Sequence, residues 1–140
     1  MTIRTIALAA AVATLLSFGP ASAQTMGWPE ASSVQTQLYF GLRTTDGTGV
    51  SEQEWAQFVF DVVTPRFPEG LTVLNAYGQG RSTPKTGAPI MFSETTKLLI
   101  LIHPNTADEA AKIEAIKAEY NKRFNQDSVF HVDFPARLVK

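Results

Sequence analysis

Cysteine is absent from the 140-residue sequence, and histidine occurs only twice. The lack of cysteine excludes a disulfide framework, a thiolate nucleophile, a Cys-ligated metal and lipid attachment at a signal cleavage site. His103 and His131 are far apart, and no H-x-x-H or H-E-x-x-H spacing occurs, so we expect no metal site and no cofactor. The motifs of nucleotide-binding proteins and serine hydrolases are also missing.

An excess of charge of either sign is missing too, with 12 Lys and Arg against 13 Asp and Glu. A nearly neutral, slightly acidic chain does not attract nucleic acid or an anionic membrane surface, so we expect neither as a partner. No apolar run reaches the roughly 20 residues needed to span a bilayer. The apolar stretch at residues 6–18 covers 13 positions.

That stretch belongs to a predicted export signal in residues 1–23. Arg4 provides the positive start, Gly19-Pro20 ends the apolar segment, and Ala21-Ser22-Ala23 is an A-x-A cleavage site. Cleavage there leaves Gln24 as the first residue and removes the apolar segment, so no stable membrane anchor remains. We therefore expect a periplasmic protein that is exported and not lipidated.

Removal of the signal leaves 117 residues, of which about 40% are apolar, with 11 basic and 13 acidic side chains. A chain of this length and composition is sufficient for one hydrophobic core. The predicted organisation is a flexible leader at residues 24–33, where Gly, Pro and Ser occur without periodicity, followed by a single domain at residues 34–140.

Four segments have the patterns of β-strands: residues 34–43, residues 71–80, a third strand that ends with residues 98–102, and residues 128–134. In the first, polar and apolar residues alternate from Leu38 onward, which indicates one buried face. The third ends in an unbroken apolar run, which is typical of a central strand covered on both faces. In the fourth, the alternation predicts that Phe130, Val132 and Phe134 share one face.

Two capping boxes mark the starts of helices, Ser51 with Glu54 and Thr106 with Glu109. After each box, apolar residues recur at the spacing of one helix face. These residues are Trp55, Phe58, Val59, Val62 and Val63 in the first helix, and Ile113, Ile116, Tyr120 and Phe124 in the second. Pro65 is expected to end the first helix, because the residue before a proline is disfavoured in helical conformation.

The resulting order is strand, helix, strand, strand, helix, strand. This order predicts an α+β, ferredoxin-like β-α-β-β-α-β fold, with a four-stranded antiparallel sheet and two helices on one face. In that topology the first and third strands are central, in agreement with the apolar run at residues 98–102.

Several segments resemble the bacterial family called domain of unknown function 3574. They are residues 38–42, 63–73, 78–80 and 97–104, within a similarity that runs from about residue 37 to residue 133. The most specific is the Thr-Pro-Arg-Phe-Pro-x-Gly stretch at residues 64–70. Many members look like exported lipoproteins, and this chain departs from them because no Cys stands at the signal boundary. The resemblance implies export and one compact domain, and it transfers no catalytic residues because the family has no assigned activity.

The face of the sheet opposite the helices, here called the open face, is the predicted location of a site. The side chains expected there are Tyr39, Arg43, Lys97, Leu99, Leu101, His103, Val129, His131 and Asp133. Tyr39, His131 and Asp133 are the catalytic candidates, because a carboxylate that orients a histidine beside a tyrosine can transfer protons. Arg43 is a candidate to hold a substrate carboxylate. The alternative is that these residues form a dimer surface or an ordinary solvated face.

Two further residues are candidates for ligand binding. Arg66 lies in the family-like stretch and is the best single choice from it. The alternative for Arg66 is pairing with carbonyl groups at the helix end or with Glu69. His103, at the end of the third strand, is the other candidate.

The leading hypothesis is a non-catalytic ligand-binding or protein-interaction module that forms a homodimer through the open face. An apolar patch containing Leu99 and Leu101 is expected there, and such patches commonly mark interfaces. The alternative is a small cofactor-free enzyme of the lyase, isomerase or monooxygenase type, with its site on the open face of a homodimer. A small-molecule ligand is a predicted partner in either case.

Overall fold

The computed structural model describes residues 31–44, 46–83 and 86–139. The predicted export signal and most of the predicted leader lie outside these residues. Within the described ranges, no helix combines the length and the apolar character that a bilayer crossing requires.

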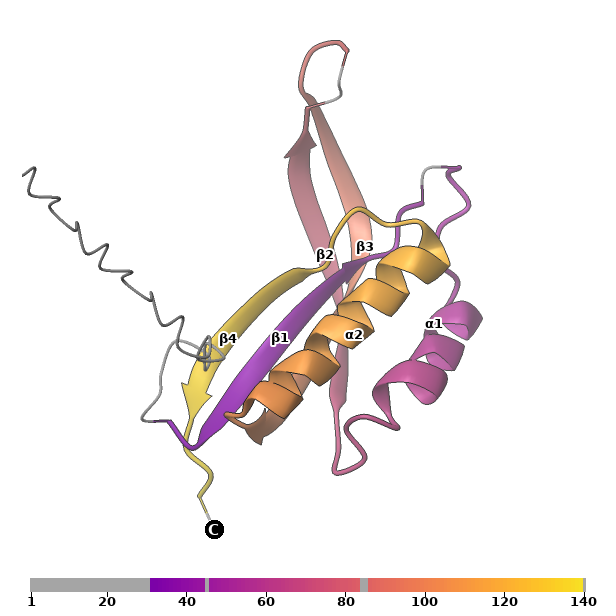
Figure 1. The fold of residues 1–140 in the computed structure, drawn as a ribbon. Helices are drawn as coiled ribbons and strands as arrows, with labels where there is room; N and C mark the ends of the chain where they lie inside the picture. The colour runs from indigo at the N-terminus through magenta and orange to yellow at the C-terminus, as the bar shows by residue number, and fades with distance from the viewer. Residues whose placement is uncertain (1–30, 45, 84–85, 140) are drawn as a thin grey trace, which may run out of the picture.

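The chain folds in the order β1 (Ser33–Gly41), α1 (Glu52–Phe58), η1 (Val59–Val63), β2 (Thr72–Ser82), β3 (Ile90–Pro104), α2 (Ala107–Phe124) and β4 (Phe130–Ala136). The four strands form one antiparallel sheet in the order β2-β3-β1-β4. Both α-helices lie on the same side of this sheet (Figure 1). The predicted ferredoxin-like α+β fold is therefore confirmed, with β1 and β3 as the central strands.

The first helix begins at the predicted capping box. The Ser51 hydroxyl accepts a hydrogen bond from the Glu54 backbone N–H, and the Glu54 carboxylate accepts one from the Ser51 backbone N–H. The helix continues through η1, a π-helical segment in which the Thr64 N–H donates to the Val59 carbonyl. The π-helical segment ends at Val63, so the helix ends close to the predicted position. The reason expected from the sequence is wrong, because Thr64, the residue before Pro65, keeps helical backbone angles (φ −56°, ψ −42°).

The second helix has only half of its predicted capping box. The Thr106 hydroxyl accepts from the Glu109 backbone N–H at 3.3 Å. The Glu109 carboxylate accepts instead from the Lys112 ammonium at 2.7 Å. The helix ends at Asn125, which has a left-handed backbone conformation that Asn tolerates better than most residues.

The hydrophobic core lies between the sheet and the two helices, and Phe40 of β1 is at its centre. The Phe40 ring centroid lies 5.1 Å from that of Trp55, 5.9 Å from that of Phe58 and 4.7 Å from that of Tyr120. These rings come from β1, α1 and α2, so the cluster joins both helices to the sheet. Edge-to-face contacts of this kind add to the stabilisation that burial gives.

β2 and β3 extend beyond the end of β1. β1 pairs with β3 only as far as Gly41 opposite Thr96, whereas β2 remains paired with β3 to Ser82 opposite Ile90. The two strands therefore project from the sheet as a hairpin arm (Figure 1). β2 extends two residues beyond its predicted end at residue 80.

Candidate functional site

The strand register decides which side chains lie on which face of the sheet. Leu38 of β1 is buried in the core and is paired with both Leu99 of β3 and His131 of β4. Residues directly opposite each other in an antiparallel pair share a face. Leu99 and His131 therefore lie on the helix-covered face, contrary to the prediction that placed both on the open face.

The same register corrects the other predicted open-face residues of β3 and β4. Lys97, Leu101 and His103 lie on the helix-covered face, opposite Phe40, Thr36 and Val34 of β1. Asp133 is also opposite Thr36, and Val129 is buried in the core. Residues 98–102 are all apolar. Because polar and apolar residues do not alternate there, the sequence does not show which of these side chains face the helices.

The three catalytic candidates do not come together. Tyr39 lies on the open face, whereas His131 and Asp133 lie on the helix-covered face. The Tyr39 hydroxyl donates to the Gln37 amide oxygen at 2.8 Å. His131 and Asp133 do contact each other, with 2.9 Å between Nε2 and Oδ1. The predicted acid–base group of three is therefore incorrect, and only its His–Asp contact is present.

The His–Asp contact belongs to a polar network that connects three strands. The Thr36 hydroxyl of β1 donates to Asp133 Oδ1 at 2.5 Å and lies 2.8 Å from Nε2 of His103. Nδ1 of His103 lies 2.8 Å from the Pro104 carbonyl oxygen. Thr36 is fully buried and His103 is nearly so, and buried polar groups require such partners. These contacts account for the burial of Thr36 and His103 on the helix-covered face.

Arg66 and His103 do lie together, at a cavity of about 260 Å³ beside the end of β3. The Arg66 guanidinium donates to the Val62 carbonyl at 2.6 Å, so its helix-carbonyl alternative is present in the structure. The His103 ring packs against Phe67, with 5.8 Å between the ring centroids. Lys112, Glu69 and Glu109 also line this cavity, so its formal charges balance and select neither anions nor cations.

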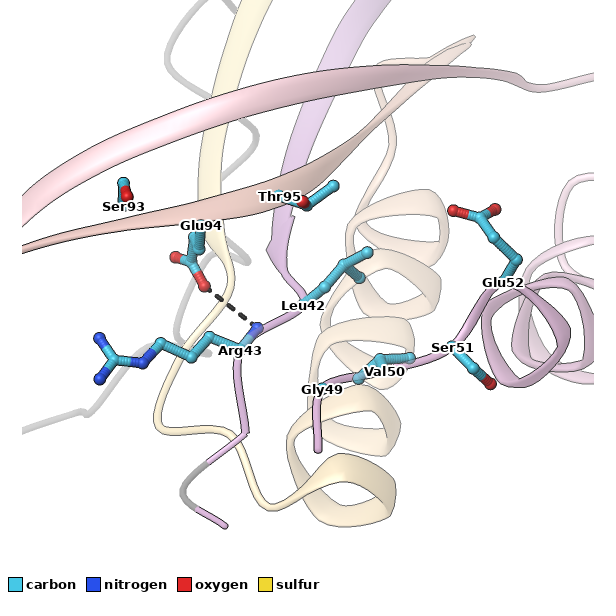
Figure 2. Close-up of a pocket in the computed structure, with 9 residues that line it drawn as sticks. All are labelled: Leu42, Arg43, Gly49, Val50, Ser51, Glu52, Ser93, Glu94 and Thr95. Atoms are coloured by element: carbon cyan, nitrogen blue, oxygen red, sulfur yellow. Dashed lines mark hydrogen bonds between the residues drawn. The ribbon is translucent and has the colours of Figure 1, made fainter. Parts of the chain in front are cut away.

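The open face is almost free of charge. Among the strand residues on this face, all of which the structure describes, Glu94 of β3 is the only charged one. No described Lys, Arg or His side chain forms an ion pair with it. Its Oε2 accepts a hydrogen bond from the Arg43 backbone N–H at 3.2 Å (Figure 2). An anionic group that is partly buried without a cationic partner favours the binding of a positively charged ligand.

Two glycines provide the space around Glu94. A Cβ atom on Gly41 would lie 2.6 Å from both carboxylate oxygens of Glu94. A Cβ atom on Gly78, on the facing strand β2, would lie 2.9 Å from the Thr96 hydroxyl and 3.9 Å from Cγ of Glu94. The absence of side chains at these two positions lets the carboxylate lie close to the backbone.

A cavity of about 510 Å³, here called the open-face cavity, adjoins Glu94. Its lining residues are Tyr39, Gly41, Ala76, Tyr77, Gly78, Glu94, Thr96, Gln126, Ser128 and Phe130. The rings of Tyr39 and Phe130 contact each other, with centroids 5.5 Å apart. A cavity of this volume, with apolar rings and a few polar groups, has the size and composition of small-molecule sites.

Glu94 also lines two adjoining cavities, of about 440 Å³ and 490 Å³. Arg43 lines both of them and is the one predicted ligand-binding residue that lies beside Glu94. Figure 2 shows that its guanidinium points away from the Glu94 carboxylate. The guanidinium carbon lies 5.9 Å from the centroid of the Phe92 ring. The charge of Arg43 therefore does not neutralise Glu94 directly.

Tyr120 of α2 supports this region from the opposite side of the sheet. Its hydroxyl donates to the Gly41 carbonyl at 2.8 Å. Burial and, as the smaller cause, the negative charge of Glu94 raise the pKa of Tyr120. The phenol therefore stays protonated at neutral pH and remains a hydrogen-bond donor to the backbone of β1.

Sequence reasoning did not identify Glu94. A single glutamate in a strand is ordinary, and its isolation becomes visible only when the register shows that every other strand residue on the same face is uncharged. Within the part of the chain that the structure describes, His, Asp and Glu side chains do not gather in a group of three that could hold a metal ion.

Comparison with known proteins identifies a family and finds solved structures with a similar fold. Residues 35–139 match the family described as "Protein of unknown function (DUF3574)". No curated protein matches the sequence. The fold is similar to that of a phage SAM lyase in complex with S-methyl-5'-thioadenosine, with a TM-score of 0.57, 14% identity, and coverage of 75% of this chain and 82% of the lyase. It is also similar to a phage SAM lyase in the apo state, with a TM-score of 0.50, 16% identity, and coverage of 78% and 94%.

Proposed function

Because the chain belongs to the DUF3574 family, which carries no assigned function, we propose a function from its own geometry: it binds a small organic cation in the open-face cavity beside Glu94. The observation that carries this proposal is the isolation of Glu94 on an otherwise uncharged face. A non-catalytic binding module is the simplest protein that needs such a site.

The chemistry of the cavity favours a cation that also has apolar surface. The Glu94 carboxylate provides the negative charge. The rings of Tyr39 and Phe130 provide faces on which a sulfonium or a quaternary ammonium group can be held by cation–π attraction. Such groups have no N–H to donate, so they depend on charge and on aromatic contact more than on directed hydrogen bonds.

The likeness to a SAM lyase supports one class of organic cation, the S-adenosyl sulfonium. The identity of 14% limits this support to the fold, so the choice between a sulfonium and a quaternary ammonium depends on experiment. Isothermal titration calorimetry with two matched pairs makes that choice. S-adenosylmethionine is compared with its neutral thioether S-adenosylhomocysteine, and choline with its neutral carbon analogue 3,3-dimethylbutanol.

We expect the cation of at least one pair to bind about tenfold or more tightly than its neutral analogue, because only the cation gains the attraction of Glu94. The pair that shows this difference identifies the class of ligand. If each cation bound with the same affinity as its neutral analogue, or if neither cation bound, the proposal would be wrong.

A second candidate function is a lyase acting on the same sulfonium, and the shared fold with a SAM lyase favours it. In such a step a carbon–sulfur bond breaks and its electron pair passes to sulfur, which becomes a neutral thioether. The Glu94 carboxylate accepts a proton from the adjacent carbon, and a carbon–carbon double bond forms. Chromatography of S-adenosylmethionine incubated with the protein tests this: S-methyl-5'-thioadenosine appears with the wild type and not with Glu94→Gln. If the sulfonium binds and no thioether forms, the protein is a binding module.

We also propose that the protein acts in the periplasm, after cleavage between Ala23 and Gln24. The positive Arg4, the apolar segment and the A-x-A site support this. Cell fractionation with N-terminal sequencing tests it, with Gln24 as the expected first residue of the periplasmic form. A full-length protein found in the cytoplasm or held in the membrane would contradict it.

A further inference from the structure

The open face has a second property besides the isolation of Glu94, because large apolar side chains are exposed along the rest of it. Leu74 of β2 is 48% exposed, Ile102 of β3 is 50%, and Phe134 and Phe130 of β4 are 45% and 66%. Together with the half-buried Leu98 and Ile100, these residues form what is here called the open-face patch. Large apolar side chains exposed on three of the four strands, β2, β3 and β4, are unusual on a protein that remains alone in water.

β4 shows the same preference in its own sequence. Its residues alternate between two faces. One face carries the apolar set Phe130, Val132 and Phe134, and the other carries a polar set that includes His131 and Asp133. The fold directs the polar set toward the helices, where hydrogen bonds satisfy it, and leaves the apolar set on the open face. An isolated domain would gain more by burying the apolar set. This orientation indicates that the open face is itself buried in the functional protein.

We infer that a second copy of this chain covers the open-face patch, in a two-fold symmetric dimer that stacks sheet against sheet. The area is appropriate. Outside the hairpin arm the sheet comprises residues 33–41, 72–76, 96–104 and 130–136. At roughly 3.3 Å per residue and 4.8 Å between strands, these give a footprint of roughly 480 Å² before side-chain relief is counted. A standard stable interface buries about 800 Å² on each partner.

The chemistry of the face also fits a second copy better than a partner of another kind. The patch carries no charge, so it selects neither a basic nor an acidic partner. Between its β3 and β4 members lie Gln35 and Gln37 of β1. Their amides both donate and accept hydrogen bonds, so the same amides of a second copy can pair with them. The charged Glu94 lies six residues from Ile100 along β3. For a two-fold axis that passes near Ile100 and runs perpendicular to the strands, the two copies' Glu94 carboxylates are roughly 40 Å apart, well beyond the screening length of about 8 Å at physiological salt.

The patch and the open-face cavity share Phe130, so the second copy also covers one side of the cavity. The covering of the cavity rests on the proposed ligand site, whereas the dimer does not. The purified protein is tested by light scattering after size exclusion and by sedimentation velocity, up to about 0.5 mM. We expect a two-chain mass.

The variant that tests the interface is Ile102→Lys, which brings two cations into an apolar contact. We expect a dimer dissociation constant at least about 100-fold higher, with an unchanged circular dichroism spectrum. Met91→Lys is the matched control, because Met91 is an exposed apolar residue of the same strand on the other face. It should leave the dimer intact. Phe134→Lys, at the exposed edge strand, is the second interface variant if Ile102→Lys does not fold.

Three results would overturn the inference. The first is a monomer at about 0.5 mM, which would assign the patch to a different partner. The second is a dimer that survives both interface variants. The third is a dimer that dissociates with Met91→Lys and not with Ile102→Lys, which would place the contact on the hairpin arm. Glu94→Gln should not change the mass, so a failed ligand site and a failed dimer give different results.

Discussion

The carboxylate of Glu94 lies in the space that a side chain at residue 41 would need. A Cβ atom built on Gly41 falls 2.6 Å from both of its oxygens, which is closer than Cβ atoms approach their neighbours. The two residues are on neighbouring central strands, β1 and β3, so this close approach is built into the middle of the sheet. Gly41 therefore decides where the one charged group of the open face can be.

Gly41→Ala should impair ligand binding much more than folding. The backbone of Gly41 does not have a positive φ, and the atoms in conflict belong to the flexible end of a side chain, so the protein can adjust by moving Glu94. We expect about tenfold weaker binding of the organic cation, because the carboxylate is displaced from the cavity. Calorimetry measures the binding, and a thermal melt within a few degrees of the wild type is the control. A large loss of stability with unchanged binding would show that Gly41 serves the fold alone.

Tyr120→Phe should have the opposite effect. The substitution removes the hydroxyl that donates to the Gly41 carbonyl and leaves the buried ring in place. We expect the free energy of unfolding to fall by about 1 kcal/mol, the typical value of one hydrogen bond. Urea denaturation measures this change. Ligand affinity should remain within about twofold, and a loss of affinity larger than tenfold would mean that Tyr120 acts on the ligand site through the backbone of β1.

Thr36→Val tests the polar network between the central and edge strands. Valine has a similar shape and cannot contact Asp133 or His103 through a hydroxyl. The substitution leaves Nε2 of the buried His103 without its partner and removes one of the two contacts of Asp133 Oδ1, so we expect a loss of about 2 to 3 kcal/mol in the free energy of unfolding. Thr36→Ser keeps the hydroxyl and is the matched control, with a smaller loss expected. Equal losses for the two variants would show that the methyl group matters and the network does not.

The capping box of the first helix predicts a pH dependence. Hydrogen bonds from the Ser51 hydroxyl and backbone hold the pKa of Glu54 below its ordinary value of 4.5. A lowered carboxyl pKa contributes stability that is present above the ordinary value and is lost as the pH falls through the folded-state pKa. The wild type should therefore be more stable than Glu54→Gln at neutral pH, and the difference should disappear in acid below that pKa.

Denaturation of both proteins across a pH series measures this difference. Glu69→Gln is the control, because Glu69 lies outside any capping box, and its difference from the wild type should change less with pH. A difference between wild type and Glu54→Gln that stays constant into acid would show that the Glu54 charge does not contribute to the cap.

Local patterns in the sequence were sufficient to predict the fold. The capping residue Ser51, the stripe from Trp55 and the apolar run at residues 98–102 are each decided by neighbours in the chain, and together they permit few arrangements. Local patterns did not predict which side chains of β3 and β4 point toward the helices. Leu98 and Leu99 are equally apolar, so only pairing with β1 decides which of them meets the helices.

The prediction of the candidate site depended on which side chains of β3 and β4 lie on the open face. His131 and Asp133 were expected on the open face because polar groups usually avoid a core. The structure instead satisfies Asp133 with Thr36, a residue 97 positions earlier, and no local pattern could show that partner. Glu94 was not found for the same reason. Its significance comes from the uncharged residues across the sheet, which the register alone brings together.

The central claim is that Glu94 recognises the positive charge of a ligand in the open-face cavity. The most direct measurement is a comparison of two affinity ratios by calorimetry: organic cation over its neutral analogue, in the wild type and in Glu94→Gln. Glutamine has nearly the same shape as glutamate and lacks the charge, so the account predicts a ratio of about ten or more in the wild type that falls to near one in the variant. A ratio that is the same in both proteins would contradict the account, because the cation would then be selected by something other than Glu94.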